Sequence, residues 1–306
     1  MKKTFTFLLI SAILAGASTT ASALGFSTVV TNDKSKNTYS KCAWESDPHL
    51  NKVPLKGKPG RRDHVWFRSY NKDFIIDAPV NVGSISVLYE GNVIAENKTI
   101  QTSKGNLMMS ASSSGVCTLT LKKSMVNIRG SIGMDVWEKL KHMGGILMDL
   151  EDSKIEATGA FSFNVPAWQA KFVKNRSGAT VKMAGDSHIK IKGDFLVDPI
   201  LSEQPNLHFR FILNEKDGKM PFFSAKQGSI KNCELHLNIK NKLRKGIYPL
   251  LEATGSKAFE GKLRAMTLNG KNISFDTVTP INGVDVIIKI GSADKKKPND
   301  IILEVK

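Results

Sequence analysis

Short blocks of alternating apolar and polar residues are the main pattern along the chain, separated by Gly, Asn, Ser and Lys. Alternation with a period of two predicts β-strands that bury one face. The clearest blocks are residues 84–89, 118–121, 181–183, 235–239 and 284–290. Helical spacing of apolar residues occurs over 134–142, before Gly144 and Gly145. The pattern predicts an all-β protein with one short helix.

A seven-residue motif, S-x-[VI]-x-[IA]-x-G, begins at Ser124, Ser153 and Ser187, with spacings of 29 (124 to 153) and 34 (153 to 187) residues. Units of this length with variable loops are typical of solenoids, in which stacked coils bury apolar residues that one coil cannot. We therefore predict a right-handed parallel β-helix or similar β-solenoid. An antiparallel β-sandwich, in which the three motifs are unrelated strands, is the alternative.

Stacking of the three motifs predicts which side chains face inward. The inward columns would be Val126, Ile155 and Ile189, then Ile128, Ala157 and Ile191. The outward residues would be Asn127, Glu156 and Lys190, then Arg129, Thr158 and Lys192, all of them polar. The glycine that ends each motif is expected at a tight corner, with a positive φ.

The N-terminus has the order of a cleavable secretory signal peptide: Lys2 and Lys3, an apolar run over 5–15, then Ala21-Ser22-Ala23. The run is about half of the roughly 20 apolar residues that a bilayer requires. We expect cleavage after Ala23 and a mature chain without a transmembrane span. The mature chain would be periplasmic, on the cell surface or extracellular.

Residues 24–306 are predicted to form a single solenoid-like domain. Within it, 24–115 would supply the N-terminal capping coils, 116–240 the repeat coils, and 241–306 the C-terminal coils and cap.

The chain carries a formal net charge of +16, which becomes +14 when Lys2 and Lys3 are removed with the signal peptide. Such a field attracts polyanions, and export excludes intracellular nucleic acid as the partner. We expect an acidic polysaccharide, lipopolysaccharide or another anionic cell-surface polymer, with plain solubility as the alternative. Arg129, Lys190 and Lys192 are the candidate anion-binding residues. Trp168 is a candidate platform for a sugar ring, because a flat exposed aromatic side chain can stack on one.

Three cysteines in an oxidising compartment predict one disulfide and one remaining thiol. The sequence does not decide among the three pairings. Cys42 with Cys117 is favoured, because Cys233 lies inside an alternating strand, where a buried thiol is common.

Two segments, one near each end of the mature chain, have short motifs similar to those of a known protein family. The first holds Trp44, the turn Pro59-Gly60-Arg61-Arg62-Asp63 and the step Val82-Gly83-Ser84; the second holds residues 243–251, 259–262 and 284–290. Together they resemble the passenger domains of exported autotransporter-type β-strand-repeat proteins. The resemblance implies a β-helix displayed outside the inner membrane, with an adhesive, structural or carbohydrate-directed role. Because no C-terminal translocator barrel precedes Lys306, we expect another export route or periplasmic residence.

Nucleophile elbows, P-loops, H-E-x-x-H and EF-hand loops do not occur in the sequence, and we expect no cofactor, no metal and no catalytic residues. The histidines are scattered, and His188 and His236 are expected to face solvent. The favoured function is a non-enzymatic surface or extracellular protein. The alternative is a calcium-dependent acidic-polysaccharide lyase on a β-helix, with Asp152 and Asp186 stacked on adjacent coils about 4.8 Å apart. Solvated turn residues are the simpler interpretation of these two aspartates.

Overall fold

The structure is a computed structural model that describes residues 25–29, 34–46, 54–68, 72–88, 92–111, 116–136, 145–164, 178–197, 207–214, 219–291 and 300–306. Strands dominate these residues and form three sheets, which we call A, B and C. Apart from the short 3-10 helix η1 (Lys34–Lys36), the described residues contain no helix. The predicted all-β fold is therefore confirmed.

Each sheet has the following strands, in their spatial order. Sheet A holds β25 (Phe259–Glu260), β22 (Gly228–Ser229), β19 (Phe195–Val197), β16 (Phe161–Asn164), β13 (Ile132–Val136), β10 (Leu107–Ala111), β7 (Ser84–Leu88), β4 (His64–Arg68), β1 (Gly25–Val29), β2 (Ala43–Glu45) and β3 (Pro54–Leu55). Sheet B holds β27 (Lys271–Asn272), β26 (Ala265–Leu268), β23 (Cys233–Ile239), β20 (Leu207–Leu213), β17 (Ala179–Ala184), β14 (Ile146–Glu151), β11 (Cys117–Lys122), β8 (Asn92–Glu96) and β5 (Asp73–Ile76). Sheet C holds β28 (Thr279–Ile281), β29 (Val284–Gly291), β30 (Asp300–Val305), β24 (Gly246–Ala253), β21 (Phe222–Ala225), β18 (His188–Ile191), β15 (Lys154–Ala157), β12 (Met125–Ile128), β9 (Thr99–Thr102) and β6 (Val80–Val82).

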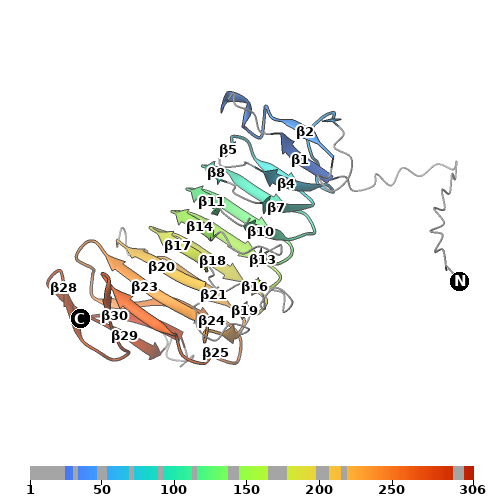
Figure 1. The fold of residues 1–306 in the computed structure, drawn as a ribbon. Helices are drawn as coiled ribbons and strands as arrows, with labels where there is room; N and C mark the ends of the chain where they lie inside the picture. Colours follow the sequence, from blue (N-terminus) through green and yellow to red (C-terminus); the bar gives the residue numbers. More distant parts are fainter. Residues whose placement is uncertain are drawn as a thin grey trace, which may run out of the picture.

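Successive strands go to successive sheets: β4 lies in A, β5 in B, β6 in C, and β7 returns to A beside β4. Three strands therefore make one coil, and the ladders between successive coils are parallel. Figure 1 shows these coils stacked along one axis. This is the predicted parallel β-helix, and the antiparallel sandwich is excluded.

Antiparallel strands cover both ends of the stack (Figure 1). At the N-terminal end, β2 pairs antiparallel with β1 and β3. At the C-terminal end, β30 pairs antiparallel with β24 and β29, and β28 closes a hairpin with β29. Such caps shield the open edges of the terminal coils from pairing with another chain.

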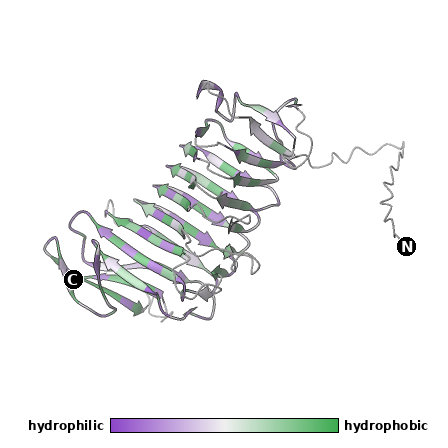
Figure 2. Cartoon of the chain, in the orientation of Figure 1, coloured by the Kyte–Doolittle hydropathy of each residue, from purple (hydrophilic) through white to green (hydrophobic). Residues whose placement is uncertain are grey.

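The core is the interior of the coils, and the predicted inward columns are confirmed. Val126, Ile155 and Ile189 are register partners with exposures of 1%, 0% and 0%. The next column, Ile128, Ala157 and Ile191, is equally buried. Figure 2 shows the corresponding alternation of hydrophobic and hydrophilic positions along the strands.

The motif serines form a buried ladder at the corner between sheets B and C. The backbone N–H of Ser124 donates to Ser153 Oγ at 3.0 Å, and that of Ser153 donates to Ser187 Oγ at 3.1 Å. Each serine follows a residue or short turn with positive φ, such as Lys123 (46°) or Asp152 (48°). The hydroxyls thus satisfy backbone donors that would otherwise be buried without a partner.

The motif glycines occupy the corner between sheets C and A, but the predicted positive φ is wrong for Gly130, Gly159 and Gly193. Close approach of neighbouring coils requires glycine there. A Cβ added at Gly193 would lie 2.5 Å from the carbonyl oxygen of Gly159, and one at Gly159 would lie 2.8 Å from the carbonyl carbon of Gly130. The N–H of Gly193 donates to Gly159 O at 2.9 Å, which fixes this contact.

Two further predictions need correction. The helix predicted over 134–142 begins inside β13, where the backbone is extended, and residues 137–142 lie outside the described residues. The predicted disulfide is not formed: Cys42, Cys117 and Cys233 are all buried thiols. Cys117 begins β11, and in sheet B the strand β8 lies between β11 and β5. Cys42 belongs to the turn after Thr38, and Thr38 pairs with Ile75 of β5. Two strand spacings of about 4.8 Å exceed the reach of a disulfide.

Burial raises the pKa of both the Cys42 and the Cys117 thiol to about 12, so both are un-ionised and unreactive at neutral pH. No helix within the described ranges is long and apolar enough to cross a membrane.

Candidate functional site

A groove of about 710 Å³ runs over the outer side of sheet C. We call it the sheet C groove, and its lining residues are Arg61, Asn81, Gln101, Thr102, Ser103, Asn127, Ile128, Arg129, Glu156, Ala157, Thr158, Lys190, Ile191, Lys192, Ser224 and Thr254. The groove crosses the strands, because its lining includes residues of β6, β9, β12, β15, β18 and β21. The remaining lining residues, among them Arg61, Arg129 and Lys192, lie in turns outside the strands. A ligand lying along it would follow the axis of the solenoid.

The floor of the groove is a continuous polar column that the strand register builds. The column contains Asn81, Gln101, Asn127, Glu156, Lys190 and Ser224, each the register partner of the next. Alternation within each strand turns these side chains outward, while their apolar neighbours fill the core. Polar groups therefore recur about every 4.8 Å along the groove.

Positive charge dominates the groove. Its lining holds four basic side chains, Arg61, Arg129, Lys190 and Lys192, and one acidic side chain, Glu156. The ammonium of Lys190 lies 5.7 Å from the centre of the Phe222 ring, within the range of a cation–π contact. The groove is thus suited to anions that carry several charges along their length.

A buried histidine packs beside this floor. The His188 ring stacks on Phe222 with a centroid distance of 5.3 Å, and the residue is 7% exposed, so it does not face solvent as predicted. Burial lowers the pKa of His188 to about 4, and the charges of Lys190 and Lys154 add to this effect. The imidazole is therefore neutral at physiological pH.

Three of the four predicted anion-binding residues, Arg129, Lys190 and Lys192, line this one groove. Trp168 lies outside the described residues.

The stacked pair of aspartates expected for a lyase is not formed. Asp152 occupies the positive-φ position that Gly185 takes in the next coil, and its carboxylate accepts a hydrogen bond from the N–H of Asp186 at 2.9 Å. Asp186 instead lies 3.1 Å from Lys219 Nζ and 3.6 Å from Lys154 Nζ.

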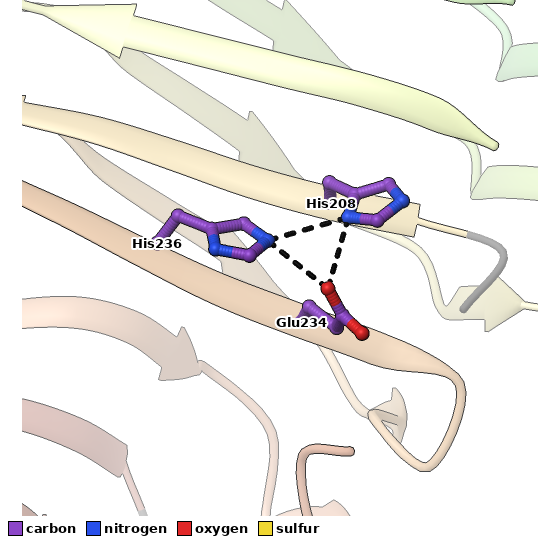
Figure 3. A group of neighbouring side chains, drawn as sticks. All are labelled: His208, Glu234 and His236. Carbon is purple, nitrogen blue, oxygen red and sulfur yellow. Dashed lines mark hydrogen bonds and ion pairs between the residues drawn. The ribbon is translucent and has the colours of Figure 1, made fainter. Parts of the chain in front are cut away.

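A second cluster lies on the outer side of sheet B, and we call it the histidine triangle: His208 of β20 with Glu234 and His236 of β23 (Figure 3). Glu234 Oε2 lies 3.2 Å from His208 Nδ1 and 3.1 Å from His236 Nε2, and these two nitrogens lie 3.3 Å apart. On the far side of the His236 ring, Nδ1 lies 2.9 Å from Thr267 Oγ1.

The triangle is partly shielded, with side-chain exposures of 21% for His208, 19% for Glu234 and 26% for His236. Burial lowers the pKa of both imidazoles, Arg210 lowers it further, and Glu234 opposes the shift. The three side chains meet because His208 is the register partner of Glu234, and Arg210 that of His236.

This cluster was not predicted, because its ligands come from two strands rather than from a metal-binding motif on one element. The signal was nonetheless present in two neighbouring blocks, L-H-F-R-F at 207–211 and C-E-L-H-L at 233–237, which share alternation. Only the pairing of one block with the next brings a histidine of the first beside both polar residues of the second. No protein-family profile, curated protein or solved structure matches this chain.

Proposed function

We propose that the mature chain is an exported, non-enzymatic structural or adhesive protein of the cell surface or extracellular space, which binds anionic glycans along the sheet C groove. The observation that carries the proposal is the groove itself, which follows a polar column across six successive coils. Lys190 belongs to the column, and Arg61, Arg129 and Lys192 line the groove with it. Its length along the axis suits an extended polymer better than a compact ligand.

The chemistry of the lining supports an acidic polysaccharide or the phosphorylated sugars of lipopolysaccharide. Arg129, Lys190 and Lys192 supply charge-assisted hydrogen bonds to carboxylate or phosphate groups. The amides of Asn81, Gln101 and Asn127 both donate and accept, as sugar hydroxyl groups require. The groove lining holds one acidic side chain, Glu156, against four basic ones. Calcium sites use several carboxylate and carbonyl oxygens, so this lining favours anion binding over calcium-dependent cleavage.

The export half of the proposal rests on the N-terminal sequence pattern, with the resemblance to autotransporter passenger domains in support. If it is correct, protein recovered outside the cytoplasm begins at Leu24, which Edman sequencing or mass spectrometry of the N-terminal peptide will identify. An intact Met1 on the exported protein would contradict cleavage.

The binding half is tested by retention on beads that carry alginate or polygalacturonate, with dextran beads as the neutral polymer. We expect retention on the acidic beads that weakens as salt rises, because screening shortens the range of charge interactions. The triple variant Arg129→Ala, Lys190→Ala, Lys192→Ala should weaken retention about tenfold or more, since each lost charge contact contributes roughly 0.5 kcal/mol or more.

A matched control removes the same charge elsewhere: Lys240→Ala, Lys242→Ala, Lys245→Ala, at three exposed positions after β23. Equal losses in the two triple variants would show that net charge alone drives binding, and would overturn the groove as the binding site. Ultraviolet absorbance from unsaturated uronate products, measured with calcium present, would instead make the protein a lyase.

A further inference from the structure

The donor atoms of the histidine triangle have the spacing that a tetrahedral metal ion requires. Their three separations are 3.1, 3.2 and 3.3 Å. Zinc bonds of about 2.0–2.1 Å in tetrahedral geometry place neighbouring ligand atoms about 3.3–3.4 Å apart. Each donor would need to move by only a few tenths of an ångström to accept the ion.

A hydroxyl accepts as well as donates, so Thr267 can hold His236 in the tautomer whose Nε2 is free to ligate a metal. When Nδ1–H donates to Thr267 Oγ1, at 2.9 Å, the neutral ring leaves its Nε2 lone pair directed at Glu234 Oε2. Two acceptors then face each other at 3.1 Å, a repulsion that a cation between them removes. Metal-ligating histidines commonly donate their other ring N–H to an oxygen in this way.

The backbone fixes the ligands without any loop. All three side chains project from β20 and β23, two paired strands inside the stack of coils. Two imidazole nitrogens and one carboxylate oxygen suit zinc and neighbouring first-row transition metals, whereas calcium and magnesium prefer oxygen alone. Arg210, the register partner of His236, opposes a cation, and the charge of Glu234 offsets it.

We propose that His208, Glu234 and His236 form a binding site for one divalent transition-metal ion, zinc foremost, with a fourth coordination position open to water or to a ligand atom. The site lies on sheet B and uses no residue of the sheet C groove. It therefore stands independently of glycan binding. The open position distinguishes this arrangement from closed structural zinc sites, in which four protein ligands surround the ion.

The experiment titrates the purified metal-free chain with zinc chloride by isothermal calorimetry, and with cobalt chloride by visible absorption. We expect about one ion per chain and the intense visible bands of tetrahedral cobalt. His208→Ala, His236→Ala and Glu234→Gln should each abolish this binding. His188→Gln, which removes a histidine from sheet C, should retain it. Stoichiometric binding that survives the ligand substitutions would overturn the site, as would failure of the unaltered chain to bind.

A milder pair of variants tests the same site without removing a ligand. Thr267→Val removes the hydroxyl that faces His236 Nδ1 and should weaken zinc binding about 10- to 100-fold, whereas Thr267→Ser should keep the affinity. Unchanged circular dichroism and unchanged retention on acidic beads would show that the variants are folded. Equal affinity of both threonine variants would show that the Thr267 hydroxyl does not support His236 as a ligand, and would contradict this part of the proposed site.

Discussion

The outer faces of sheets B and C share one coil register yet gather different chemistry. On sheet C, six successive coils contribute one polar residue each to a long groove. On sheet B, two adjacent coils bring three ligand atoms within 3.3 Å of one another. In a β-helix the number of coils that contribute thus decides whether a site suits an extended polymer or a single ion.

Both faces depend on the same core, and Phe209 connects them. Its ring lies 5.9 Å from Phe195 of sheet A and 5.1 Å from Phe223 of sheet C. In sequence, Phe209 follows His208 of the triangle, and Phe223 precedes Ser224 of the groove.

The largest expected effect follows from Phe209→Ala, because this substitution should impair the sites on sheets B and C together. The ring is fully buried, so its removal should lower the free energy of unfolding by about 3–5 kcal/mol. Chemical denaturation followed by circular dichroism measures this loss. Zinc binding and bead retention should decline together as the variant unfolds. A variant that loses only one of them would show that the two faces are supported separately.

The corner glycines allow the two faces to be separated. Gly193→Ala places a Cβ 2.5 Å from the carbonyl oxygen of Gly159, so the backbone beside Lys192 must move. We expect a loss of about 1–3 kcal/mol in the free energy of unfolding, as for other overpacked sites. Retention on acidic beads should also weaken, because Lys192 shifts, whereas zinc binding should not change.

Gly60→Ala is the control for this substitution, since its Cβ would meet only the Asp63 carboxylate, at an ordinary 3.5 Å. If both alanine variants have the stability of the unaltered chain, close approach of the coils is not the reason for glycine at position 193.

The inward and outward columns of the solenoid could be predicted from the sequence, because alternation and the repeated motif determine which residues align. Val126, Ile155 and Ile189 could be aligned without knowing any contact, and the same alignment put Lys190 and Lys192 on the outer face. The role of the motif serines and glycines was not accessible in this way. It depends on contacts between coils, namely a hydroxyl that reaches the next N–H and a corner too close for a Cβ.

The sequence also did not reveal which residues of neighbouring coils are register partners where one coil carries an inserted residue. Asp186 matches Asp152 by distance from the serine, but the coil inserts one residue, and Gly185 takes the equivalent position. The histidine triangle depends on the register of β20 against β23, which no periodicity within either strand reveals.

The last expected effect concerns pH and sharpens the contrast between the histidines of the two faces. His236 contacts the carboxylate of Glu234, whereas His188 stacks on Phe222. Because the folded pKa of His188 is about 4 and the unfolded value is about 6.5, the unfolded chain takes up this proton first as pH falls. The free energy of unfolding should therefore decrease as pH falls between these two values, by at most about 1.4 kcal/mol for each pH unit.

His188→Gln should flatten this decrease, because glutamine does not titrate. The measurement compares the denaturation midpoints of the unaltered chain and His188→Gln at several pH values between neutrality and about 4. Lys190 and Lys154 oppose protonation of His188, while Asp186 and Glu156 favour it. Lys154→Met should therefore make the decrease in stability shallower, since removing a nearby cation raises the folded pKa towards the unfolded one. Identical pH profiles for the unaltered chain and His188→Gln would show that burial on sheet C does not hold this imidazole neutral, and the contrast with sheet B would disappear.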